Sequence, residues 1–134
     1  MKACVLNAIN NLKYQDTPTP EPKEDEVLVK IMASGICGSD VARVFTKGTY
    51  HFPTIPGHEF AGQITKVGNS LDKELIGKKV AVFPLIPCFE CDNCQIGQYA
   101  QCSSYNYYGS RCDGGFAEYI AVKSWNLVIV PDDL

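Results

Sequence analysis

Hydrophobic and polar residues alternate along several short stretches of the chain, as in β-strands that have one buried face. The stretch 26–32 shows this pattern well, because Val27, Val29 and Ile31 share the face that we expect to meet the core. Further short apolar stretches, separated by glycine, proline and asparagine, lie at 2–6, 12–14, 61–67, 80–83, 116–122 and 126–130. The sequence has almost no long helical periodicity. The pattern therefore predicts a mainly β, barrel-like domain with short helices.

The links between these stretches predict specific turns. Asn10 and Asn11 favour a hairpin between the first two strands, since asparagine tolerates left-handed backbone. After the strand at 26–32, Ser39 or Asp40 can cap a short helix that runs to about Phe45. The stretch 71–76 is expected to form a loop or a single helical turn.

Composition narrows the possible classes of protein. The 134 residues suit one domain, with 46% hydrophobic and 20% charged residues. The net charge of −3, without a basic run, argues against nucleic acid or an anionic membrane as the main partner. Neither a membrane-spanning apolar stretch nor a secretory signal is visible, so we expect a cytoplasmic protein whose seven cysteines are reduced or bind metal.

Four cysteines gather in one short segment: Cys88, Cys91, Cys94 and Cys102. Three of them recur at every third residue, so a regular helix or strand cannot point them all inward, whereas a loop around an ion can. Four thiolates at about 2.3 Å complete the tetrahedral sphere of Zn²⁺ and leave no open position. Disulfides or free thiols are the alternatives, but closely spaced Cys-x-x-Cys pairs are geometrically poor disulfide partners. The spacing therefore predicts a structural zinc site.

A second candidate metal site combines Cys37, His58 and Glu59. Cys37 precedes a predicted helix start, where free N–H groups and the helix dipole favour a thiolate. Taken singly, Cys37 fits a small buried thiol equally well, and a lone histidine is usually a hydrogen-bonded group. Together they indicate mixed ligation by few protein groups, which leaves a position for water or substrate, as catalytic zinc requires.

Several motifs occur in an order that resembles the zinc-dependent medium-chain alcohol and polyol dehydrogenases. They are Gly35-Ile36-Cys37-Gly38-Ser39-Asp40, Pro56-Gly57-His58-Glu59, Gly77-Lys78-Lys79-Val80-Ala81-Val82, the cysteine segment 88–102 and Asp113-Gly114-Gly115-Phe116-Ala117-Glu118-Tyr119. The resemblance covers essentially all 134 residues. It implies that residues 1–134 form an N-terminal GroES-like catalytic domain, a partly open β-barrel with a zinc lobe inserted at 84–112.

The resemblance also implies a chemistry. Cys37 and His58 would hold a catalytic zinc ion, Glu59 would be a direct or exchanging ligand, and Ser39 would take the alcohol proton. The implied reaction oxidises a secondary alcohol of a polyol or polyol phosphate to a ketone, with NAD as hydride acceptor. A simple alcohol or amino-alcohol (threonine-type) dehydrogenase, or a stand-alone zinc module without enzymatic activity, is the alternative.

Three features depart from the family pattern. Many members carry a histidine of the proton relay where this sequence has Ala42. A further zinc ligand of the family lies beyond this domain. There is also no G-x-G-x-x-G motif, so the NAD-binding Rossmann domain is absent from this chain, and we expect the 134 residues alone to be nearly inactive. The resemblance further implies that the full-length protein is a homo-oligomer, either a dimer or a tetramer.

Two arginines, Arg43 and Arg111, are the candidates for binding a substrate phosphate, because the guanidinium fork matches phosphate oxygens. The alternative for each is a solvated surface arginine. The tyrosine-rich segment 103–109 is expected to pack against the zinc lobe rather than to form a binding site.

Overall fold

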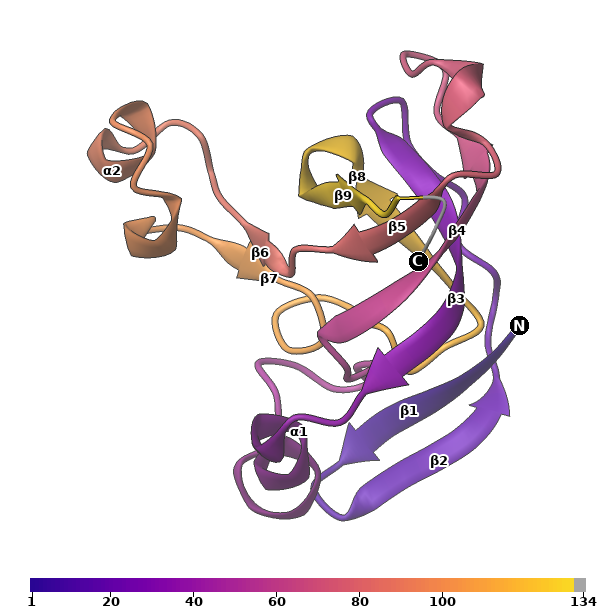
Figure 1. Ribbon diagram of the computed structural model, residues 1–134. Helices are drawn as coiled ribbons and strands as arrows, with labels where there is room; N and C mark the ends of the chain where they lie inside the picture. The colour runs from indigo at the N-terminus through magenta and orange to yellow at the C-terminus, as the bar shows by residue number, and fades with distance from the viewer. Residues whose placement is uncertain (132–134) are drawn as a thin grey trace.

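The computed structural model describes residues 1–131, and its strands dominate the architecture (Figure 1). The strands are β1 (Lys2–Ala8), β2 (Asn11–Asp16), β3 (Glu26–Gly35), β4 (Glu59–Val67), β5 (Lys79–Val82), β6 (Leu85–Ile86), β7 (Asn106–Tyr107), β8 (Tyr119–Lys123) and β9 (Leu127–Ile129). The helical segments are all short: α1 (Gly38–Ala42), α2 (Asp92–Gln95), a π-helical turn η1 (Arg43–Lys47), and the 3₁₀ turns η2 (Lys73–Leu75), η3 (Tyr99–Gln101) and η4 (Ser124–Asn126). The mainly β prediction is therefore confirmed.

Three antiparallel sheets organise residues 1–131. The largest has the strand order β8-β3-β4-β5-β9, and the pairs β1-β2 and β6-β7 form separate small sheets. Isolated bridges from Ala3 to Ala117 and from Leu6 to Thr54 connect the β1-β2 hairpin to the rest of the fold. The sheets remain open rather than closing into a barrel, in agreement with the expected partly open form.

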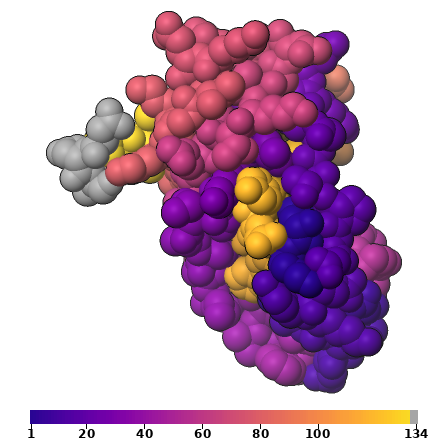
Figure 2. Space-filling view, turned by 90° about the vertical axis from the view of Figure 1, so that its right-hand side faces the viewer, coloured from indigo at the N-terminus to yellow at the C-terminus, as the bar shows by residue number. Residues whose placement is uncertain are grey.

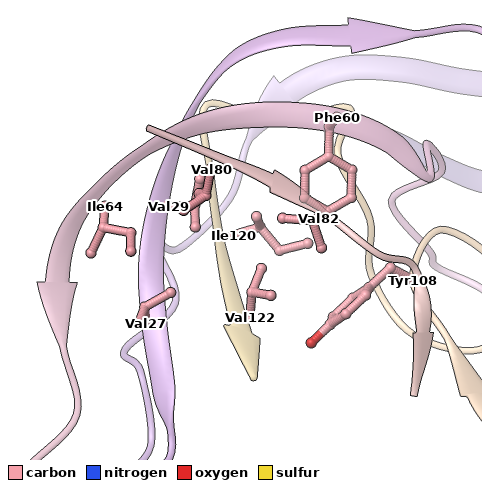
Figure 3. Close-up of a cluster of buried hydrophobic side chains, with 9 residues drawn as sticks. All are labelled: Val27, Val29, Phe60, Ile64, Val80, Val82, Tyr108, Ile120 and Val122. Atoms are coloured by element: carbon pink, nitrogen blue, oxygen red, sulfur yellow. The ribbon is translucent and has the colours of Figure 1, made fainter. Parts of the chain in front are cut away.

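The main core lies on one face of the five-stranded sheet (Figure 3). Val27 and Val29 are fully buried there, and Ile31 packs against the same cluster, so the predicted core face of this strand is confirmed. The buried members are Val27, Val29, Phe60, Ile64, Val80, Val82, Tyr108, Ile120 and Val122. Tyr108 reaches the core from the tyrosine-rich segment, and its hydroxyl accepts a hydrogen bond from the Lys123 N–H at 3.0 Å.

The start of the short helix differs from the prediction. Cys37, rather than Ser39 or Asp40, is the N-cap residue of α1, and the helical path continues as η1 to Lys47. The reason is that Asp40 lies in the first turn and its Oδ2 accepts a hydrogen bond from the Cys37 N–H at 3.0 Å. Cys37 and Asp40 thereby form a capping box at the start of the helix.

The strand expected at 116–122 begins later, at Tyr119. The backbone of Phe116 instead forms hydrogen bonds to other segments. Its N–H donates to the Pro56 carbonyl at 3.0 Å, and its carbonyl accepts the Cys4 N–H at 2.8 Å. Figure 2 shows orange-yellow surface from the last part of the chain beside the indigo surface of β1. This segment therefore joins the hairpin to the loop before β4.

A lobe between β6 and β7 projects from the sheets and contains α2 and η3 (Figure 1). Its base, the two-residue β6-β7 ladder that pairs Leu85 with Tyr107 and Ile86 with Asn106, was not predicted. Within residues 1–131, no helix has the length and apolar character needed to cross a membrane.

Candidate metal centres

The four thiols of the lobe converge on one point. The sulfur atoms of Cys88, Cys91, Cys94 and Cys102 all lie within 4.8 Å of one another. The Cys88 and Cys94 sulfurs are 3.9 Å apart. Four thiolates at about 2.3 Å around a tetrahedral zinc ion would be separated by about 3.8 Å. The described cysteines are free thiols, so the arrangement fits a metal better than a disulfide.

Local backbone structure produces this convergence. Cys91 is the N-cap residue of α2, Cys94 lies within that helix, and Cys102 directly follows η3. Backbone N–H groups also point at sulfur, because the Cys88 N–H donates to Cys102 Sγ and the Cys91 N–H donates to Cys88 Sγ, at 3.3 and 3.4 Å. Such N–H···S contacts favour thiolates, the form that binds metal.

The protonation of two lobe thiols differs strongly. Hydrogen bonds from the backbone N–H groups of Ser103 and Cys94 lower the pKa of Cys91 to about 6. Burial raises the pKa of Cys94 to about 12. A buried thiol of this kind ionises only when a cation compensates its charge, which is what a bound zinc ion would do.

Aromatic rings fix the lobe to the sheet. The ring of Trp125 lies 5.1 Å from Phe89, 5.3 Å from Tyr99 and 6.1 Å from Phe83, measured between centroids, with each pair close to edge-to-face. Phe89 and Tyr99 belong to the cysteine lobe, whereas Trp125 is in η4 beside β9. The lobe geometry is thus coupled to the fold through one aromatic cluster.

The second group of donors comes from two neighbouring strand ends. One donor atom each of Cys37, His58 and Glu59 lies within 4.8 Å of the others. The pairing of Gly35 with Glu59 at the ends of β3 and β4 sets this proximity, since Cys37 follows β3 and Glu59 begins β4. His58 is buried and Glu59 is exposed, so the three donors form a sulfur, nitrogen and oxygen set that is open on one side.

A buried carboxylate connects two of these donors. Asp40 is only 1% exposed, and its Oδ1 lies 3.2 Å from His58 Nδ1. Its Oδ2 accepts the Cys37 N–H. The sequence alone indicates only a possible capping role for Asp40; its position three residues after Cys37, on the first helical turn, is the signal that points to the site.

Glycine packing holds the His58 loop in place. A Cβ at Gly114 would lie 2.0 Å from the Gly57 carbonyl oxygen, and one at Gly109 would lie 2.4 Å from it. The Gly115 N–H donates to the same carbonyl at 2.8 Å. Only residues without a side chain allow the segments 109 and 114–115 to approach the backbone just before His58 so closely.

Ser39 and the two arginines surround adjoining cavities. Arg43 Nη1 donates to Ser39 Oγ at 2.7 Å, and both residues line an open cavity of about 410 Å³. Arg43 also lines a second cavity, of about 190 Å³, together with Arg111. The structure therefore brings both candidate phosphate-binding residues to one cavity and joins one of them, Arg43, to Ser39 by a hydrogen bond.

The tyrosine-rich segment divides between packing and this site. Tyr108 belongs to the core, whereas Tyr105 and Tyr107 line the smaller cavity. The Tyr107 ring lies 5.8 Å from the His58 ring. Burial raises the pKa of Tyr107, which keeps its hydroxyl protonated.

The chain is similar in sequence to known proteins. Residues 23–132 match the family described as the alcohol dehydrogenase GroES-like domain. The chain belongs to this family. It is 46% identical to galactitol 1-phosphate 5-dehydrogenase of Escherichia coli K12 and 38% identical to sorbitol dehydrogenase of Bacillus subtilis, each alignment covering all of this chain and 39% of the relative.

The fold of this GroES-like domain is shared as well. The crystal structure of galactitol-1-phosphate dehydrogenase from Escherichia coli superimposes with a TM-score of 0.94 and 46% identity, over 99% of this chain and 39% of that one. The stretches 85–89 and 109–116 resemble those of galactitol-1-phosphate 5-dehydrogenase, and the identity over the whole chain confirms this likeness. The chain spans about two fifths of the length of these relatives.

Proposed function

We propose that this chain forms the N-terminal catalytic domain of a zinc-dependent, NAD-linked dehydrogenase that oxidises a secondary alcohol of a polyol or polyol phosphate to a ketone. The observation that carries this proposal is the cluster of Cys37, His58 and Glu59, together with Ser39, which follows Cys37 by two residues and lines an open cavity. The names of relatives, galactitol 1-phosphate 5-dehydrogenase and sorbitol dehydrogenase, support this substrate class.

The two donor sets suit two different roles for zinc. The four thiols of the lobe would fill the coordination sphere, so an ion there would be structural. Cys37, His58 and Glu59 offer fewer donors and an open side, which suits a catalytic ion. Because His58 Nδ1 faces Asp40, Nε2 is the ring nitrogen left for the metal. A zinc ion held by these residues would supply Lewis acidity toward the alcohol oxygen.

Ser39 is the group proposed to receive the proton of the alcohol. Its hydroxyl already accepts a hydrogen bond from Arg43, whose guanidinium holds the oxygen in a fixed position. Arginine has no acceptor for a proton. The proton of Ser39 would therefore leave to water in the cavity of about 410 Å³ that Ser39, Ala42 and Arg43 line. Ala42 itself has no group to continue the relay.

The remaining part of the reaction lies outside these 134 residues. A hydride acceptor is required, and NAD supplies that chemistry when bound. The sequence offers no dinucleotide-binding glycine motif, and the relatives are longer, so we propose that a Rossmann domain in the rest of a full-length protein binds NAD. We also propose that the full-length protein is cytoplasmic and assembles as a dimer or tetramer.

Steady-state kinetics of the zinc-loaded, full-length protein tests this function. NAD reduction with galactitol 1-phosphate, galactitol, ethanol and L-threonine would be compared, and the product analysed for a ketone. We expect the highest kcat/KM with one of the two polyol substrates. Preference for ethanol or L-threonine would favour the alternative dehydrogenases, and absence of turnover with all four would favour a stand-alone zinc module.

A further inference from the structure

Arg43 and Arg111 are the only arginines of the sequence, and both line the same cavity of about 190 Å³. They are far apart in the chain, since Arg43 begins η1 and Arg111 follows β7. No carboxylate is among the described residues that line this cavity. The other polar groups that face it are Tyr50, Tyr105, Tyr107 and Ser110. The cavity therefore has a positive lining with hydroxyl groups around it.

Arg111 is held between two aromatic rings. Its guanidinium carbon lies 4.1 Å from the Tyr50 ring centroid and 4.4 Å from the Tyr105 ring centroid. Its Nη2 donates to the Tyr50 hydroxyl at 3.3 Å. Stacking of this kind fixes the orientation of a guanidinium without neutralising its charge.

Arg111 also carries a donor without a partner. Its Nε is buried and makes no hydrogen bond within the described residues. Buried polar groups are nearly always hydrogen-bonded, so an orphaned donor on a charged side chain needs an explanation. No ion pair joins Arg111 to a carboxylate in the part of the chain that the structure describes. An anion in the cavity would compensate the charge of this guanidinium.

Arg43 connects this cavity to the proposed reaction site. One of its five N–H groups binds Ser39 Oγ at 2.7 Å, and its Nη1 lies 3.7 Å from Asp40 Oδ1. Other N–H groups of the same guanidinium remain for a ligand. Lys47 adds a further positive charge to the adjoining cavity of about 410 Å³, which Arg43 and Tyr50 also line. An anionic group bound by Arg43 would therefore be linked through this side chain to Ser39, the hydroxyl proposed to take the alcohol proton.

We propose that Arg43 and Arg111 form a subsite for the phosphate monoester group of the substrate. This inference rests on the proposed function, and it specifies a phosphorylated polyol over the free polyol. Arginine forks bind phosphate oxygens through paired charge-assisted hydrogen bonds, and the tyrosine rings pre-orient one of the two forks. The phosphate would fix one end of the polyol while its secondary alcohol extends toward Cys37, His58 and Glu59.

The test uses full-length, zinc-loaded protein with galactitol 1-phosphate and galactitol as a matched substrate pair. We expect the wild-type protein to prefer the phosphate, and Arg111→Gln to lower the ratio of the two kcat/KM values by about 10- to 100-fold. Arg111→Lys should retain part of the ratio. Lys13→Gln, which removes one positive charge from exposed β2, should leave the ratio unchanged.

Inorganic phosphate provides an independent readout. Isothermal titration should show phosphate binding to the wild-type protein that Arg111→Gln weakens and Lys13→Gln does not, with matching circular dichroism spectra as evidence that the variants fold. Equal kcat/KM for galactitol 1-phosphate and galactitol would overturn the subsite and leave the dehydrogenase proposal standing. If the wild-type protein turned over neither substrate but still bound phosphate in a way that depends on Arg111, the proposed reaction would be overturned and the anion site retained. Phosphate binding that is unchanged in Arg111→Gln would also overturn the subsite.

Discussion

His58 Nδ1 and Asp40 Oδ1 lie 3.2 Å apart, and both side chains are almost completely buried. The two atoms have no hydrogen-bond partner of good geometry within the described residues, although they face each other. The second oxygen of Asp40 accepts the Cys37 N–H. One carboxylate therefore contacts two of the three proposed ligands of the catalytic metal, and it would orient the imidazole as soon as a metal binds the other ring nitrogen.

Asp40→Asn tests this positioning role. The amide can still accept the Cys37 N–H, but it lacks the negative charge that supports the histidine, so we expect metal affinity at this site to fall by about 10- to 100-fold. Chelator competition monitored by metal release would measure it. Asp16→Asn changes an exposed carboxylate that pairs with Lys2 and serves as the control. Equal affinities for the two variants would contradict the role given to Asp40.

Trp125 is the only tryptophan of the sequence and reports on the cysteine lobe. Its ring contacts Phe89 and Tyr99 of the lobe, at centroid distances of 5.1 and 5.3 Å. Removing the lobe zinc should release these rings and increase the exposure of the indole, because the ion closes the loop that carries them. We expect a red shift of the fluorescence emission on chelation, and the same shift without chelator in Cys94→Ser.

The control for the fluorescence measurement is Cys37→Ser, which removes a ligand of the other proposed site. This variant should keep the wild-type emission until chelator is added. An emission maximum that does not change while the lobe loses its metal would show that the lobe keeps its shape without zinc.

Gly114→Ala should destabilise the fold. Its Cβ would lie 2.0 Å from the Gly57 carbonyl oxygen, so backbone beside His58 would have to shift. Overpacking of this kind costs about 1–3 kcal/mol of unfolding free energy, which urea denaturation would measure. At Gly38 a Cβ meets no atom within 4 Å, so Gly38→Ala is the matched control and should lose much less stability. A loss of equal size in both variants would mean that the close approach of the two segments is not the cause.

The sequence predicted the elements whose causes are local. Alternation around Val27 and Val29 identified the interior strand β3, and Asn10 identified the hairpin turn, where its φ of 62° is indeed left-handed. The spacing of Cys88 and Cys91 with their two partners indicated a common centre, because these thiols are close in the chain and a loop can bring them together.

Features that depend on distant segments were not predictable in this way. Arg43 and Arg111 share a cavity only because the fold brings η1 next to the loop after β7. The role of Tyr107 also depends on the fold, because a tyrosine-rich segment alone does not show which ring enters the core and which faces the site. Asp40 was considered only as a helix cap, since its second partner, His58, comes from another strand end.

The most direct test of the account is the metal content of the full-length protein and of two cysteine variants. We predict two zinc ions per chain for the wild-type protein, and one ion for Cys37→Ala together with loss of NAD-dependent turnover, because this variant removes a ligand of the open site. Cys94→Ala should instead lose the lobe ion and weaken the fold. If Cys37→Ala kept both ions and full activity, Cys37 would not be a ligand of a catalytic metal, and the central claim would be contradicted.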